Sequence, residues 1–315
     1  MQFRTKIPIP QTDFSIDYNS KIVSLGSCFA ENMAEKLDHF KFQNTSNPFG
    51  IIFNPVSIEK MIHKVVNQEL FSEKDIFFHN ERWHCFDAHS ALSTSKKEDL
   101  IANLNAIIIS SKQQLQEATH IIITYGTSWV YRNIESNNVV ANCHKLPQAA
   151  FKKEILSIET IEKSIKNTID LIQEINPDIN FIFTVSPVRH LKDGFVENQL
   201  SKAHLISGLH SSDINLPTSI YFPSYEIMMD ELRDYRFYAE DMIHPSKVAI
   251  DYIWQRYLET TIAPETHSIM KEVETIQRGL AHQPFNPNAE SHQQFLAKLQ
   301  ERITALVSQY SFMKF

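Results

Sequence analysis

With 315 residues, of which 43% are hydrophobic and 21% charged, the chain is long enough for one large α/β domain with additions or for two modest domains. Its net charge of −7 argues against nucleic-acid binding, which usually needs a basic surface. No apolar run approaches the ~20 residues that cross a bilayer, so we expect no membrane span.

The three cysteines, Cys28, Cys85 and Cys143, are scattered and suggest no disulfide framework. The first residues lack the apolar core of a signal peptide, so we expect a cytoplasmic protein with reduced thiols. Several histidines lie near two of the cysteines, but their spacing matches no zinc site. These histidines are His79, His84, His89 and His144. We expect neither a metal nor a cofactor.

The apolar run 21–25 predicts a buried strand that ends at Gly26. Apolar residues at helical spacing follow, from Phe29 to Leu37, so Gly26-Ser27-Cys28 is predicted to form a tight strand-to-helix turn. A second short strand is expected at 41–44. The pair Asn54-Pro55 predicts the start of the next helix, with asparagine as its cap.

The middle of the chain alternates apolar strands with amphipathic helices. Loops and a small hairpin are expected at 72–95, helices at 100–115 and 158–172, strands at 120–125 and 179–185, and a hairpin at 130–141. Strands that are apolar on both faces predict a doubly wound, mostly parallel sheet between two layers of helices. In such α/β/α folds, ligands bind at the carboxyl ends of the strands.

Beyond about residue 262 only helical patterns remain, and two prolines separate them. We therefore predict a domain at 1–262 and a C-terminal helical extension at 263–315. The extension is expected to pack on the main domain or to form a homo-oligomer.

Cys28 is the first candidate for chemistry. A helix N-terminus stabilises a thiolate and lowers the thiol pKa, and backbone N–H groups there can receive a developing oxyanion. The alternative is a small buried cysteine that only fills space. Ser27, directly before the helix, is more simply explained as its N-cap than as a nucleophile.

The second candidate is Asp241-Met242-Ile243-His244, followed by Pro245. This spacing lets the carboxylate orient the imidazole and stabilise its cation. The alternative is an exposed turn in which Asp241 caps the following helix.

The string VSLGSCFA at 23–30 resembles the signature of the GSCFA family, which looks like a branch of the SGNH (GDSL-type) hydrolase superfamily. The resemblance extends to most of residues 1–262 but does not cover the extension. It continues through Asn47-Pro48-Phe49-Gly50, the segment 126–132, the segment 140–145, Ser186-Pro187-Val188-Arg189-His190 and Asp241-Met242-Ile243-His244-Pro245.

The resemblance implies roles for particular residues. Overlaying the superfamily's Gly-Asp-Ser places Ser27 on the aspartate and Cys28 on the nucleophile, and the late Asp-x-x-His places Asp241 and His244 as orienter and base. Gly50 is the best match for the oxyanion-hole glycine, and Gly126 matches the glycine of Gly-x-Asn-Asp. Ser128 stands where an oxyanion-binding asparagine is expected, and Asn142 is the other candidate for that amide.

Arg189 and His190 follow a predicted strand end, where arginine can bind a substrate anion and histidine can bind substrate or compete as the base; a purely structural pair is the alternative. The resemblance implies an acyl-ester hydrolase, or an acyltransferase, that acts on a small-molecule or carbohydrate ester through a covalent acyl-enzyme. The competing hypothesis is a binding module on the same fold that has lost turnover.

Overall fold

The computed structural model describes residues 5–212 and 217–315. Its centre is a sheet in the order β10-β9-β5-β1-β2, and every neighbouring pair of strands is parallel. The strands are β1 (Lys21–Gly26), β2 (Gln43–Ser46), β5 (His120–Tyr125), β9 (Asn180–Val185) and β10 (Ser219–Phe222). All six residues of β5 are buried, as expected for a strand that is covered on both faces. The predicted parallel sheet is confirmed.

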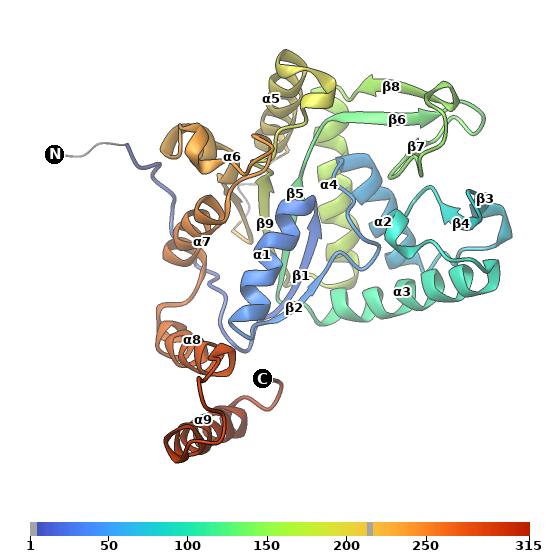
Figure 1. The fold of residues 1–315 in the computed structure, drawn as a ribbon. Helices are drawn as coiled ribbons and strands as arrows, with labels where there is room; N and C mark the ends of the chain where they lie inside the picture. Colours follow the sequence, from blue (N-terminus) through green and yellow to red (C-terminus); the bar gives the residue numbers. More distant parts are fainter. Residues whose placement is uncertain (1–4, 213–216) are drawn as a thin grey trace.

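Two layers of helices cover the sheet (Figure 1). One layer consists of α2 (Pro55–Asn67), α3 (Lys97–Glu117), α4 (Ile158–Ile175) and α5 (Phe195–Ser211). The other contains α1 (Cys28–His39), α7 (Lys247–Thr261) and α8 (His267–Ala281). Side chains alternate between the two cores, since Ile121 and Ile123 join the first and Ile122 the second. The chain thus has the predicted three-layer α/β/α fold.

Two small antiparallel sheets extend from the α2–α3 side. One is the hairpin of β3 (Ile76–His79) and β4 (Arg82–Cys85). The other has the order β7-β6-β8 and consists of β6 (Trp129–Asn133), β7 (Val139–Val140) and β8 (Phe151–Ile155). The hairpin expected at 130–141 is present, and β8 adds a third strand that the sequence pattern did not predict.

The second strand begins two residues later than expected. Lys41 has a positive φ of 63°, and the N–H of Phe42 still bonds to the carbonyl of Leu37 in α1. The chain is therefore still leaving the helix at residues 41–42, and the strand starts only at Gln43. The helix start at 54–55 is as predicted, because the Asn54 side chain accepts a hydrogen bond from the N–H of Ser57 (2.9 Å).

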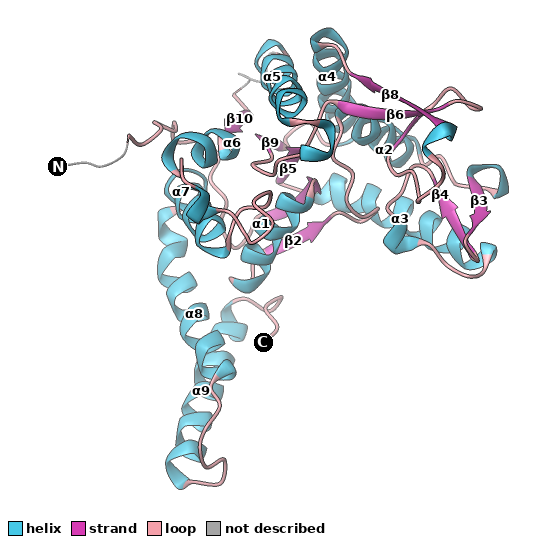
Figure 2. Cartoon of the chain, turned by 45° about the horizontal axis from the view of Figure 1, so that its top comes forward, coloured by secondary structure: helices cyan, strands magenta, loops and turns pink. Residues whose placement is uncertain are grey.

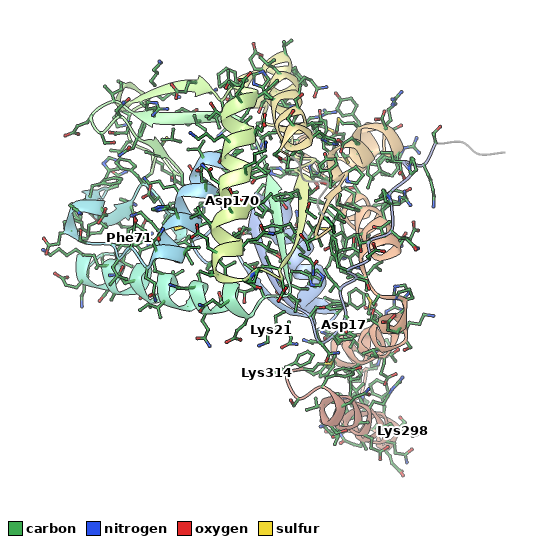
Figure 3. The ribbon with its side chains drawn as sticks, turned by 180° about the vertical axis from the view of Figure 1, so that it is seen from behind. Asp17, Lys21, Phe71, Asp170, Lys298 and Lys314 are labelled. Carbon is green, nitrogen blue, oxygen red and sulfur yellow. The ribbon has the colours of Figure 1, made fainter. Side chains whose placement is uncertain are left out.

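The C-terminal extension is a helical hairpin of α8 and α9 (Glu290–Gln309) that projects from the body (Figure 2). Figure 3 shows the molecule from behind, with Lys298 labelled on this hairpin and Asp170 labelled on α4. The chain end returns to the domain, where the rings of Tyr310 and Tyr18 lie 5.3 Å apart. The division at residue 262 stays a prediction. Within the described residues, no helix has the length and apolarity that a membrane crossing requires.

Candidate active site

The turn between β1 and α1 is built around Gly26. Its φ of +134° suits glycine, and a Cβ atom there would lie 2.1 Å from the carbonyl oxygen of Thr124 in β5. The Gly26 N–H bonds to the Asn47 side chain (2.8 Å), and the Ser27 N–H bonds to the Thr124 carbonyl (3.1 Å). The turn is therefore fixed against the neighbouring strand, and it places Cys28 at the carboxyl edge of the sheet.

Ser27 is the N-cap of α1. Its buried side chain accepts a hydrogen bond from the N–H of Phe29 (3.2 Å), which is the capping role that the sequence favoured for it.

Cys28 is the first residue of α1 and is half-buried. Burial raises the pKa of its thiol and the carboxylate of Glu31 adds to the rise, while the N–H groups of Phe29 and Cys28 and the charge of Lys202 act in the opposite direction. The expectation of a lowered thiol pKa is wrong, because desolvation outweighs the helix N-terminus in the free protein.

Asp241 and His244 form one compact turn, in which Met242 has a φ of 58°. One carboxylate oxygen accepts hydrogen bonds from the N–H groups of Ile243 (2.9 Å) and His244 (3.0 Å), and the other lies 2.6 Å from Nδ1 of His244. These hydrogen bonds lower the pKa of Asp241 to about 2. The carboxylate therefore orients the imidazole as predicted, with Nε2 left for other partners.

Asp241 does not cap the following helix, so that part of the alternative is wrong, although the turn is exposed as the alternative expected. The N-cap of α7 is Ser246, whose hydroxyl accepts from the N–H of Ala249 (3.3 Å). Both Asp241 and His244 remain about half exposed, with side-chain exposures of 47% and 49%.

The Asp241–His244 turn is attached to the segment after β9, since the N–H of Arg189 bonds to the carbonyl of Ile243 (3.3 Å). Ile243 and Cys28 pack against the same core cluster. Within the described part of the chain, however, no hydrogen bond joins the Cys28 sulfur to the His244 ring. The structure places the proposed nucleophile and base at one edge of the sheet, with no hydrogen bond between them in the described chain.

His190 lies beside Gly126, which directly follows β5. Its Nε2 atom is buried and, among the described residues, has no hydrogen-bond partner. A Cβ atom on Gly126 would lie 3.4 Å from this nitrogen. Burial, together with the charges of Lys202 and His244, lowers the pKa of His190 to about 3. His190 is therefore a neutral imidazole beside the end of β5.

The guanidinium of Arg189 packs on two tyrosine rings. It lies over the ring of Tyr238, 4.1 Å from the centroid, and 5.2 Å from that of Tyr235. These cation–π contacts favour the structural interpretation of this residue.

The predicted oxyanion donors are mostly engaged elsewhere. The N–H of Gly50 bonds to the Asn47 carbonyl and that of Gly126 to the Phe53 carbonyl, both at 2.7 Å. Ser128 is fully buried and its hydroxyl donates to the Ser201 carbonyl (3.1 Å). These assignments need correction, because backbone and core contacts already use the donors.

Asn142 is half-buried, and its side-chain oxygen accepts from the N–H of His144 (2.8 Å). No hydrogen bond in the described chain links Asn142 to Cys28. Among the described residues, the donor that remains beside the sulfur is the N–H of Cys28 itself, because the N–H of Phe29 is already bonded to the Ser27 side chain.

Two residues at the site were not predicted from the sequence. Lys202 of α5 is fully buried and donates to the carbonyls of Gly126 (2.6 Å) and Ser186 (2.7 Å). The side-chain oxygen of Asn47 accepts a hydrogen bond from the N–H of Gly26, while its Nδ2 atom is buried without a partner among the described residues. Lys202 lies in a segment without a regular apolar face and gives no signal by itself, although Asn47 lies in the family-like string Asn47-Pro48-Phe49-Gly50.

A small cavity of about 30 Å³ lies beside Gly26 and Asn47. Besides Asn47 Nδ2, it is lined by Ser111 Oγ and Gln114 Oε1, which are also buried and lack partners in the described chain. A volume of this size corresponds to one or two water molecules. The cavity is too small to receive an acyl substrate.

The histidines near Cys85 and Cys143 make contacts within the protein. His84 bonds to the Ser93 hydroxyl (2.6 Å) and the His79 carbonyl (3.0 Å), and His144 bonds to the Cys85 carbonyl (2.6 Å). Over residues 5–212 and 217–315, no group of three or more His, Cys, Asp or Glu side chains is arranged to hold a metal ion.

The buried histidines predict acid sensitivity. Burial lowers the pKa of His120 and His144 to about 4, and that of His190 to about 3, from an ordinary value of 6.5. Below about pH 6.5 the unfolded chain therefore binds protons that the folded protein does not. The free energy of unfolding should fall on acidification by at most about 1.4 kcal/mol per pH unit for each histidine.

This dependence is tested by urea unfolding between pH 7 and pH 4. We expect the free energy of unfolding to change less steeply with pH in His120→Gln than in the wild type. If the two pH dependences coincide, His120 has the same pKa in the folded and the unfolded protein.

The geometry defines a class of site, in which a cysteine side chain on a strand-to-helix turn shares the edge of a parallel sheet with a carboxylate–imidazole pair. The chain matches the GSCFA family over residues 21–257 and the C-terminal domain of GSCFA domain proteins over residues 273–315. It therefore belongs to the GSCFA family. The first match includes Cys28, Asp241 and His244. No curated protein matches the chain.

Proposed function

We propose that this protein is an SGNH-type acyl-ester hydrolase, or an acyltransferase, with Cys28 as its nucleophile. The observation that carries the proposal is the 2.6 Å contact between Asp241 and Nδ1 of His244, at the sheet edge where α1 presents Cys28. A carboxylate that orients an imidazole beside a nucleophile is the arrangement that recurs in acyl transfer. The substrate class that we propose is a small-molecule or carbohydrate acyl ester.

The reaction would proceed in two steps. His244 takes the proton of the Cys28 thiol, and the sulfur attacks the acyl carbonyl while Asp241 stabilises the imidazolium. The N–H of Cys28 at the start of α1 receives the oxyanion, and collapse of the tetrahedral intermediate expels the alcohol, which takes the proton back from His244. Water or a second hydroxyl then attacks the thioester and releases Cys28. Because His244 is not bonded to the sulfur in the free protein, the proposal requires the two groups to approach when substrate binds.

The test is a burst assay with an activated acetyl or butyryl ester. We expect a stoichiometric burst and an acyl adduct on the peptide that contains Cys28, detected by intact and peptide mass spectrometry. Cys28→Ala should abolish both, and His244→Ala should slow acylation at least about 100-fold. Cys143→Ala, which removes another half-buried thiol, is the matched control. Wild-type behaviour of Cys28→Ala and His244→Ala would refute the assignment.

A second candidate function is ligand binding without turnover. It is favoured by the raised thiol pKa and by the engagement of Gly50, Gly126 and Ser128 in other hydrogen bonds. Tight binding of an ester or acid that Cys28→Ala leaves unchanged, with no acyl adduct, would support this function over catalysis.

We further propose a cytoplasmic protein that self-associates through its C-terminal helices. All three cysteines are free, which suits a reducing compartment. The hairpin exposes Leu280, Phe285, Phe295 and Leu296. Sedimentation should give a dimer for the full chain and at least tenfold weaker association for a Phe285→Ser/Leu296→Ser variant. A full chain that stays monomeric at high concentration would exclude this arrangement.

A further inference from the structure

The buried carboxylate of Glu231 joins three parts of the chain that are far apart in the sequence. Glu231 ends the π-helical turn η5 (Ile227–Glu231), and its side chain has an exposure of 0%. One carboxylate oxygen accepts a hydrogen bond from the N–H of Ile7 (2.8 Å) and lies 3.4 Å from Nε of Arg256. The other oxygen accepts from the hydroxyl of Tyr252. Glu231 therefore connects η5 both to the N-terminal residues and to α7.

The N-terminal residues 5–16, which we call the strap, pass beside α7 (Figure 1). Arg256 on α7 donates to the carbonyl of Ile7, so that Glu231 and Arg256 together bind the N–H and the carbonyl of this one residue. The end of the strap pairs with Ile262, which directly follows α7. The strap is thus fixed along α7, and it reaches Glu231 through the backbone of Ile7.

The loop that carries Asp241 and His244 covers residues 232–246. It starts directly after Glu231 and leads into α7, the helix whose tyrosine and arginine side chains meet this carboxylate. The contacts between Glu231 and α7 therefore close the loop at its base. The position of the Asp241–His244 turn depends on how firmly this base is held.

We infer that Glu231 is a positioning residue for the Asp241–His244 pair, and that the strap completes its set of hydrogen-bond partners. A buried carboxylate is costly unless its oxygens are paired, so the conformation in which both the strap and α7 reach Glu231 is favoured over others. That conformation fixes where the loop leaves η5 and where it enters α7. Glu231 acts through the loop, and its catalytic meaning rests on the proposed function.

The first test measures the native-state hydrogen exchange of two loop amides. The N–H of Ala239 bonds to the carbonyl of His244 (2.7 Å), and the N–H of Ser246 bonds to that of Phe237 (2.8 Å). Glu231→Ala should make both amides exchange at least tenfold faster, because the loop then opens locally. Glu231→Gln should restore the rates to within about threefold of the wild type, because its amide still offers an acceptor and a donor. A loss of global stability alone would instead speed exchange in β5 and leave local opening of the loop unchanged.

Glu259→Gln is the matched control for Glu231→Ala. Glu259 also pairs with Arg256, at 2.5 Å, but it is half exposed on α7. This variant should leave the exchange of both loop amides within about twofold of the wild type. Unchanged exchange in Glu231→Ala, or an equal acceleration in Glu259→Gln, overturns the inference.

The second test changes the strap and does not depend on the stability of the Glu231 variants. Ile7→Pro removes the N–H that bonds to Glu231, in a segment that already contains Pro8 and Pro10. It should accelerate the same loop amides at least threefold and add nothing to the effect of Glu231→Ala. Ile9→Pro, which changes the strap but keeps that N–H, is the control and should leave them unchanged. Equal exchange in Ile7→Pro and Ile9→Pro would exclude a role of the strap.

The third test is kinetic and uses an activated acyl ester. Glu231→Ala should lower kcat by about tenfold to 100-fold while KM stays within about twofold, because displacement of the loop misplaces the base without changing substrate binding. An unchanged kcat would exclude the positioning role. The exchange measurements require no ester turnover, so a failure of this inference is distinct from a failure of the proposed function.

Discussion

Asp241→Asn is expected to lower kcat on an activated acyl ester by about 100-fold to 10,000-fold while leaving the fold intact. The backbone turn survives because an asparagine oxygen still accepts from the N–H groups of Ile243 and His244. The amide N–H₂, however, would face Nδ1 of His244 in place of the carboxylate oxygen. Nδ1 must then become an acceptor, which moves the imidazole proton to Nε2 and removes the base that Cys28 requires.

The chain offers a matched control in the same loop. Asp234 also accepts a backbone hydrogen bond two residues ahead, from Arg236 (2.9 Å), and hydrogen bonds lower its pKa to about 2 as well. Asp234→Asn should therefore leave kcat within about twofold of the wild type. Equal turnover in Asp241→Asn and the wild type would remove His244 from the proposed mechanism.

Gly26→Ala is expected to destabilise the protein by more than about 3 kcal/mol, a large part of the 5–15 kcal/mol typical of a folded domain. An alanine at this position would have to adopt a φ of +134°, and its Cβ would lie 2.1 Å from the Thr124 carbonyl oxygen. Relief requires β1 to move away from β5, where the two strands are paired in register. The midpoint of urea unfolding, compared with that of the wild type, measures the loss.

Gly279→Ala provides the control for this substitution. A Cβ there would lie 2.7 Å from Cδ1 of Leu299, the far end of a flexible side chain, within the helix α8. Alanine also favours a helix interior over glycine by up to about 1 kcal/mol. The free energy of unfolding of Gly279→Ala should stay within about 1 kcal/mol of that of the wild type. Equal stability of Gly26→Ala and the wild type would show that the turn is not fixed as described.

The strands and helices with clear apolar periodicity could be predicted from the sequence. β1, β5 and β9 were visible as apolar runs, and α1 and α4 as regular apolar faces. The helix α5 was not, because Phe195, Val196 and Leu200 are exposed while Lys202 is buried, so its pattern does not follow one face. Tertiary position overrides local periodicity there.

The candidate site could be predicted only where it is local in sequence. The contact between Asp241 and His244 joins residues three apart, and the Ser27 cap lies beside the residues that it serves. The hydrogen bonds of Gly126 and Ser128, by contrast, are made to residues far away in the sequence, such as Ser201, which lies 73 residues from Ser128. Burial of Cys28 and the position of Lys202 likewise arise from packing between two helical layers, which no short motif records.

The hairpin of α8 and α9 has a consequence for how the chain can be divided. Its exposed connection around Phe285 joins α9 to the rest, while Leu299 is buried against α8, and Leu306 and Met313 are buried in the core cluster that includes main-domain residues. A single proteolytic cut at this connection would leave residues 290–315 in place without a covalent link. The two pieces, produced separately, should then reassociate, which would make the terminal segment a removable and replaceable part of the fold.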